Sequence, residues 1–216
     1  MAMLGQAGQY IVANPTAFAK AAGVHVSLSL CALAIAALLA VPAAIALAHS
    51  RGVVALAGIN VVNAGRTLPS LAVLALVMPV LGTGFTPSLF ALTLLALPPI
   101  LINTFVGVRA VDADVIDSAR GMGMRADDIL WTVELPIALP VIFAGLRTAA
   151  VQVVSGAVLA AFIGGGGLGD YITAGIAMMS MHLVLVGAIP VTLLSLGADA
   201  LFGTLQKRLT SKGLAA

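Results

Sequence analysis

Charged residues are scarce in this chain: they make up 8% of its 216 residues, whereas 61% are hydrophobic. Soluble domains are about one quarter charged, so this composition excludes an ordinary water-soluble protein. Aromatic residues are also scarce, at 5%, and the apolar content is mainly alanine, leucine, valine, isoleucine and glycine. Because small residues let helices approach closely in lipid, we predict an all-α polytopic membrane protein rather than a barrel.

Cysteine is nearly absent, because Cys31 is the only one, and this excludes an intrachain disulfide. Its apolar surroundings predict a small buried hydrophobe. The ten lysines and arginines are scattered and form no basic stripe with interleaved aromatics, so we expect no nucleic-acid partner. No cation precedes Lys20, so the pattern of a cleaved signal peptide is missing and residues 1–23 are expected to form a retained external segment.

Five long apolar segments dominate what is present. A helix needs about 20 mainly apolar residues to cross a bilayer. The segments that meet this requirement are Val24–Ala48, Val53–Val80, Ser88–Val108, Pro136–Ile163 and His182–Leu205. Residues 24–205 therefore form the predicted transmembrane domain, followed by a tail over 206–216.

One strongly polar block, residues 109–135, interrupts this domain and holds six of the eight acidic residues. In a five-span layout, the cations of this block lie on the same side of the membrane as the cations that follow the first and the fifth span. These cations are Arg51, Arg109, Arg120, Arg125, Lys207, Arg208 and Lys212. Only Lys20 remains for the opposite face, so the positive-inside rule places the N-terminus outside and the block and the C-terminus in the cytoplasm.

The polar block itself begins with helix signals. Asp112 is a plausible N-cap, and Asp114 and Asp117 follow in the first turns, where acidic side chains favour the helix dipole. Apolar residues then recur on one face, namely Val115, Ile116, Ala119 and Met122. This spacing predicts a short amphipathic helix that can dock in a groove.

The same block carries a recognisable motif: Asp117-Ser118-Ala119, three residues, Gly123, nine residues, Val133, one residue, then Leu135-Pro136. This pattern resembles the EAA loop of permease subunits of ABC importers. Two further stretches resemble the osmoprotectant branch, whose solutes are glycine betaine, carnitine, choline or proline. They are Thr67-Leu68-Pro69-Ser70-Leu71-Ala72 and the run from Phe162 to Asp170.

The resemblance implies the type I ABC importer permease fold, with a cytoplasmic coupling helix seated on an ATPase subunit. The residues it assigns to coupling are Asp117, Ser118, Ala119, Gly121, Met122, Gly123, Val133, Leu135 and Pro136. It also implies a bacterial inner-membrane location, two ABC ATPase subunits that bind the ATP and magnesium, and an extracytoplasmic substrate-binding protein. The chain itself is expected to bind no cofactor and to catalyse no reaction.

Five spans are too few to enclose a passage, so we expect a second copy or a paralogous permease. Polar residues recur in two spans, and the predicted lining of the passage is Asn63, Arg66, Thr67, Ser70, Thr148, Gln152 and Ser155. An arginine exposed to lipid costs several kcal/mol, which favours a water-filled surrounding for Arg66. The hydroxyl groups fit hydrogen bonds between helices equally well. Pro69 predicts a kink within the second span.

A glycine run near the end of the fourth span satisfies G-x-G-x-x-G but follows a membrane span, and the chain contains no Walker motif. We therefore predict a tight or re-entrant turn, with Gly165, Gly166, Gly167 and Gly169 as its gate residues. The three histidines lie at different span ends, which predicts neither a catalytic nor a metal site.

Trp131 and Tyr171 fall on opposite sides of the membrane and cannot form an aromatic cage for a quaternary ammonium group, so we expect an external protein to select the solute. Alternatives that remain are the same architecture importing another small solute, such as an amino acid, or, less favoured, a channel or secondary transporter. A structural anchor alone would not need the polar stripes.

Overall fold

The computed structural model describes residues 2–50 and 52–209, and these residues form a helical bundle. Its α-helices are α1 (Ala2–Ala13), α2 (Pro15–Ala48), α3 (Gly52–Gly65), α4 (Ser70–Leu81), α5 (Phe85–Arg109), α6 (Ala113–Gly121), α7 (Ala126–Ile129), α8 (Leu135–Gly156), α9 (Gly169–Ala177) and α10 (Met181–Leu209). A π-helical segment η1 (Leu130–Glu134) precedes α8, and a 3-10 segment η2 (Ala157–Ile163) follows it.

Four of the five predicted spans coincide with long apolar helices, namely α2, α5, the continuous run Ala126–Ile163 and α10. The second predicted span, Val53–Val80, is wrong as a single helix: it is divided into α3 and α4, which meet at 92°. The break falls at Pro69, which precedes α4 with an extended backbone. Proline lacks the N–H of a helical hydrogen bond and disfavours helical geometry in the residue before it, so the chain turns here instead of kinking.

Small residues hold the centre of the bundle together. On α2 the buried positions recur every four residues at Leu28, Ala32, Ala36 and Ala40. This stripe packs against α5 and α8, which contribute Ala96, Ile100, Ala149 and Val153 to the same cluster. Because alanine side chains are short, the three helices approach closely and form the rigid frame of the molecule.

Polar bonds join α10 to this frame. The Nε and Nη2 atoms of Arg147 on α8 each donate to a carboxylate oxygen of Asp199 on α10, at 2.6 Å in both cases. Further along, the side-chain amide of Gln206 donates to the carbonyl oxygen of Pro140 at 2.8 Å. The bidentate ion pair and this additional hydrogen bond therefore fix the register of α8 and α10.

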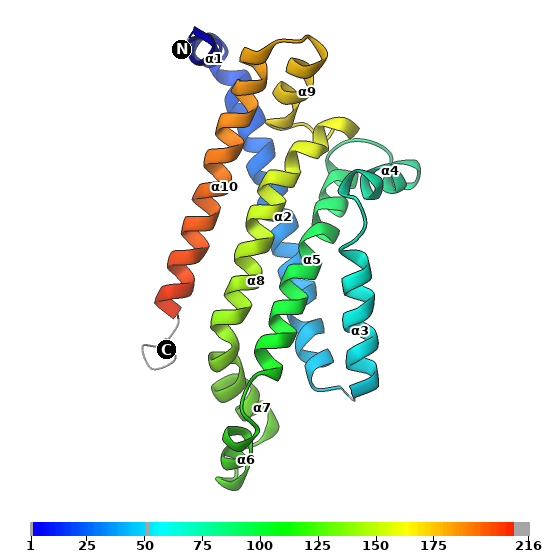
Figure 1. Ribbon diagram of the computed structural model, residues 1–216, viewed down its shortest axis with the longest axis vertical. Helices are drawn as coiled ribbons and strands as arrows, with labels where there is room; N and C mark the ends of the chain where they lie inside the picture. The colour runs from blue at the N-terminus through cyan, green and yellow to red at the C-terminus, as the bar shows by residue number, and fades with distance from the viewer. Residues whose placement is uncertain (1, 51, 210–216) are drawn as a thin grey trace.

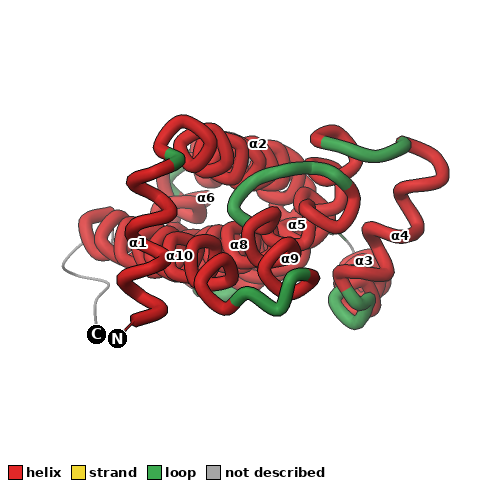
Figure 2. The backbone as a smooth tube through the Cα atoms, turned by 90° about the horizontal axis from the view of Figure 1, so that it is seen from above, coloured by secondary structure: helices red, strands yellow, loops and turns green. Residues whose placement is uncertain are grey.

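Helices α1 and α9 lie at one end of the bundle and α6 and α7 at the other, and α10 runs from the first end toward the second (Figure 1). Seen along its length (Figure 2), α3 and α4 lie to one side of α5 and α8, and α1 and α10 lie to the other. The predicted external segment 1–23 contains α1 and the first turns of α2. Cys31 is exposed rather than buried, because the buried stripe of α2 lies on a different face.

Candidate functional site

The predicted coupling helix is present as α6, and its start agrees with the sequence signals. Asp112 is the N-cap: its Oδ1 accepts a hydrogen bond from the backbone N–H of Asp114 at 2.9 Å. On the surface of the helix, Arg120 donates to Asp117 at 3.1 Å. Capping and this local ion pair favour the helix at its start and on its surface.

The apolar face of α6 is divided between two environments. Ala119 is 2% exposed and packs against its own chain, whereas Val115 and Met122 are 42% and 76% exposed. The outward apolar surface of α6 therefore consists of Val115 and Met122. Gly121 ends the helix, and Gly123 follows with φ +84°, a conformation that favours glycine.

The end of the predicted motif is anchored in the bundle. Val133 lies in η1, and Leu135 and Pro136 begin α8. Leu135 packs against a buried cluster formed by Ala48 of α2, Val108 of α5, and Ala138 and Ile142 of α8. Helix α6 is therefore joined through α7 and η1 to a point that packs on the frame helices.

No sequence pattern predicted a histidine beside a carboxylate, but the structure places such a pair next to this anchor. The Nε2 atom of His49, at the end of α2, lies 2.8 Å from a carboxylate oxygen of Glu134. The two residues are 85 positions apart. The only local signal was an acidic residue placed directly before an apolar span.

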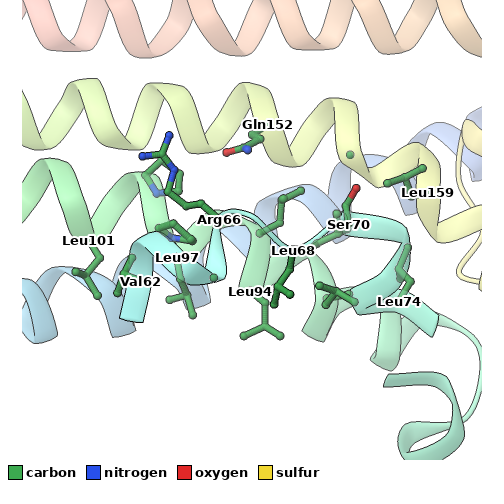
Figure 3. Close-up of a pocket in the computed structure, with 18 of the residues that line it drawn as sticks. Val62, Arg66, Leu68, Ser70, Leu74, Leu94, Leu97, Leu101, Gln152 and Leu159 are labelled. Carbon is green, nitrogen blue, oxygen red and sulfur yellow. The ribbon is translucent and has the colours of Figure 1, made fainter. Parts of the chain in front are cut away.

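A cavity of about 490 Å³ lies between the break of α3 and α4, helix α5 and helix α8. Its walls are mainly valine, leucine and proline, and its polar residues are Arg66, Ser70, Thr148 and Gln152. Figure 3 shows the Arg66 side chain reaching from the break toward α8, which carries Gln152. The fold thus brings four of the seven predicted lining residues to one cavity.

The other three predicted lining residues lie elsewhere. Asn63 and Thr67 are exposed on the α3 side and do not line this cavity. Ser155 lines an adjoining groove of about 660 Å³, together with Thr148, Gln152 and the ion pair of Arg147 with Asp199. The partner of Arg147 lies 52 residues further along the chain, and no sequence signal connected the two residues.

The hydroxyl groups of Thr148 and Ser155 bond within their own helix. Thr148 Oγ1 donates to the carbonyl oxygen of Ala144 at 3.0 Å, and Ser155 Oγ donates to that of Val151 at 2.8 Å. Both acceptors belong to α8 itself, and Thr148, Gln152 and Ser155 are all exposed. One face of α8 is therefore polar, and the residues that the structure describes leave it uncovered.

The glycine run forms a tight turn. Gly164, Gly166 and Gly167 have φ values of +72°, +76° and +100°. A Cβ atom at Gly165 would collide with the side chain of Ser88, and one at Gly169 would collide with the backbone of Val158. The glycines are thus explained by backbone conformation and by contact with neighbouring helices, without a bound ligand.

An aromatic cluster next to this turn was missed by the sequence analysis, which considered only Tyr171 on this side. Tyr171 packs edge-to-face on Tyr10 of α1 with centroids 6.0 Å apart, and it also contacts Phe18 of α2 at 6.3 Å. Burial raises the pKa of the Tyr171 hydroxyl, and the nearby Tyr10 and Asp170 raise it further. Burial also raises the pKa of Asp170. These rings pack on one another and attach α1 to the bundle.

Comparison with known proteins agrees with these features. Residues 25–211 match the family described as binding-protein-dependent transport system inner membrane component. The chain is 46% identical over 190 residues to the carnitine transport permease protein OpuCB of Listeria monocytogenes. The matched region covers 88% of this chain and 87% of that protein.

The chain is also 40% identical over 193 residues to the glycine betaine/carnitine/choline transport system permease protein OpuCB of Bacillus subtilis. This match covers 89% of the chain and 88% of that protein. The fold is similar to a chain of the MetNI methionine ABC transporter in an inward-facing conformation, with TM-score 0.79, 17% identity, and coverage of 89% of this chain and 96% of that one. From the motif in the polar loop, the bundle of long apolar helices and these matches together, we conclude that the chain belongs to the inner-membrane components of binding-protein-dependent transport systems, the non-catalytic permease subunits of ABC importers.

Proposed function

We propose that this chain pairs with a second copy of itself or with a paralogous permease, and that the pair forms the passage of an importer for a compatible solute such as glycine betaine, carnitine, choline or proline. The relatives named above transport carnitine, or glycine betaine, carnitine and choline, and the match covers nearly nine tenths of the chain. The similarity to a methionine transporter, at 17% identity, concerns the fold alone.

The polar face of α8 and the cavity at Arg66 support a passage at this position. A guanidinium group and three polar side chains exposed to hydrocarbon would be strongly unfavourable. Within the described residues the chain leaves them uncovered, so a second permease and water are the surroundings that satisfy them. The ion pair of Arg147 with Asp199 faces the same groove and adds to its polarity.

Orientation follows from the distribution of cations. Arg109, Arg120 and Arg125 lie in or beside the α6 end of the molecule, and Lys207 and Arg208 lie in the last turn of α10 at the same end. Arg51 and Lys212, which the sequence analysis assigned to this face, lie outside the described residues. The positive-inside rule places this end in the cytoplasm and α1 on the outer side of a bacterial inner membrane.

Partner subunits supply the energy and select the solute. Two ABC ATPase subunits bind ATP and magnesium, and the outward surface of α6, Val115 and Met122, contacts one of them. An extracytoplasmic substrate-binding protein delivers the solute to the outer end. The packed rings of Tyr10, Phe18 and Tyr171 leave no open cage between them, which is in keeping with selection by that external protein.

The observation that carries the proposal is α6, a capped helix that projects from the cytoplasmic end with an exposed apolar surface, and Gly123 beside it provides the test. Gly123→Arg places a charged side chain next to Met122 at a left-handed position. We expect loss of ATP-dependent uptake in proteoliposomes and loss of the ATPase subunit from the purified complex, with the chain still inserted in the membrane.

Gly123→Asn is the matched control, because asparagine tolerates left-handed backbone geometry. It should retain most of the uptake. If Gly123→Arg leaves both uptake and the bound ATPase subunit unchanged, α6 is not the coupling helix.

A further inference from the structure

A buried carboxyl group lies between the coupling helix and the membrane. Glu134 is 6% exposed and is the only carboxyl group buried among residues 2–50 and 52–209. It is the last residue of η1, the π-helical segment that leads directly into α8. A buried carboxylate requires a partner that stabilises it, and here the partner is His49 at 2.8 Å.

The second contact of His49 shows which nitrogen of its imidazole ring carries a hydrogen atom. The Nδ1 atom lies 2.9 Å from the carbonyl oxygen of Ile45, which is an acceptor only, so Nδ1 carries a hydrogen. In a neutral imidazole Nε2 is then an acceptor, and it faces a carboxylate oxygen that is also an acceptor. The short contact between them is a hydrogen bond only when the pair holds one additional proton, on the ring or on the carboxyl group.

This bond lies where three frame helices end. The neighbouring residue Ala48 packs in the cluster that contains Leu135, the first residue of α8. On α5, Arg109 donates to the carbonyl oxygen of Ser50 at 3.4 Å, which joins α5 to the same end of α2. The start of α8 is therefore held on α2 by packing and by the contact of His49 with Glu134, and α6 is joined to α8 through α7 and η1.

A π-helical turn is a local distortion, and such turns occur frequently at functional sites because they place a side chain that a regular helix would direct elsewhere. Here the turn directs Glu134 to His49. The connection between α6 and α8 consequently has a fixed point on α2, rather than ending in a free loop.

We propose that His49 and Glu134 are positioning residues for energy coupling: their hydrogen bond fixes the start of α8 to α2, so that displacement of α6 moves the helices of the passage. This inference rests on the proposed role of α6. Without the bond, displacement of α6 bends the segment η1, and ATP is hydrolysed with little transport.

Two substitutions of Glu134 distinguish the contribution of its hydrogen bond from the contribution of its side-chain volume. Glu134→Gln keeps the bond, because its amide N–H donates to the acceptor Nε2 of neutral His49 without any additional proton. Glu134→Leu has a similar size but cannot form the bond. The measurement is solute transported per ATP hydrolysed, in proteoliposomes that contain the complete importer. We expect about a tenfold fall for Glu134→Leu, as for the loss of one hydrogen bond, and little change for Glu134→Gln.

His49→Phe provides a second route that removes the same bond while the Glu134 side chain stays in place, and the substituted side chain is itself 48% exposed. It should lower the transport yield per ATP in the same way, while the ATPase subunit still copurifies. An unchanged yield for both Glu134→Leu and His49→Phe would overturn the proposal, as would a Glu134→Gln variant as defective as Glu134→Leu. These outcomes leave α6 intact and bound, so they are distinct from the failure of the coupling helix tested at Gly123.

Discussion

The frame of α2, α5 and α8 and the broken span of α3 and α4 are both apolar, yet they pack very differently. Helix α2 has eight buried residues, most of them alanines at four-residue spacing. Helix α3 buries only Ala55, and α4 buries only Leu74, among the residues described. Val53, Leu56 and Val61 of α3 are 82%, 64% and 72% exposed.

This difference shows that apolarity and packing are separate properties in a membrane protein. Lipid is as apolar as leucine, so the hydrophobic effect brings both regions into the bilayer but does not press them together. Close packing requires small residues that face a neighbouring helix, and these form a long buried stripe on α2, whereas α3 buries only Ala55 among the residues described. The broken span consequently covers the cavity without belonging to the closely packed frame.

The largest effect is expected in the frame, at Gly145 on α8. A Cβ atom there would lie 2.7 Å from the backbone oxygen of Pro99 and from the Cβ of Asn103 on α5. Backbone atoms cannot move aside, so Gly145→Ala should destabilise the chain by about 1–3 kcal/mol or more. Thermal unfolding in detergent measures this. Gly197→Ala, where a Cβ atom has no neighbour within 4 Å, is the control and should not lower the melting temperature.

An intermediate effect is expected at Arg66, which belongs to the broken span. Because the residue is exposed at the break and lines the cavity, Arg66→Leu should reduce uptake several-fold. The melting temperature should remain close to that of the unmodified chain. Arg66→Lys keeps the positive charge and should retain more uptake than the leucine variant. Loss of stability without a specific loss of uptake would assign Arg66 to folding and weaken the comparison.

The smallest effect is expected at Gly58, where α3 meets α2. A Cβ atom there would also lie 2.7 Å from its nearest neighbour, but that neighbour is a terminal methyl group of Leu47, which can rotate away. Alanine also favours a helix over glycine by about 1 kcal/mol, which offsets the crowding. Gly58→Ala should therefore change the melting temperature little. A loss as large as that at Gly145 would show that α3 is packed as rigidly as the frame.

Features that depend on neighbouring residues could be predicted from the sequence. The start of α6 at Asp112 was predicted because capping involves the next two or three residues, and the hydrogen bond to Asp114 confirms it. The prediction of an all-α polytopic permease fold is also confirmed, because hydropathy is a property of each segment. The prediction of the second span as one kinked helix was wrong because a proline such as Pro69 is compatible with either a kink or a complete break, and the local sequence does not distinguish the two.

Contacts between distant residues were the part that could not be predicted. His49 and Glu134 are separated by 85 residues, and Arg147 and Asp199 by 52, so no spacing rule connects them. The aromatic cluster was missed because Tyr10 lies in a segment that was treated as an external extension. For α6, the apolar spacing was correct, but only the fold shows that Ala119 faces inward and Met122 outward.

By itself, the sequence determined that the chain lies in a membrane, that it is helical, and that one polar block interrupts its apolar segments, because these depend on the composition of continuous segments. The tertiary structure alone decided where the second span breaks, which polar residues share a cavity, and which distant side chains contact one another. These depend on the relative placement of helices, which small-residue packing and a few long-range polar bonds determine.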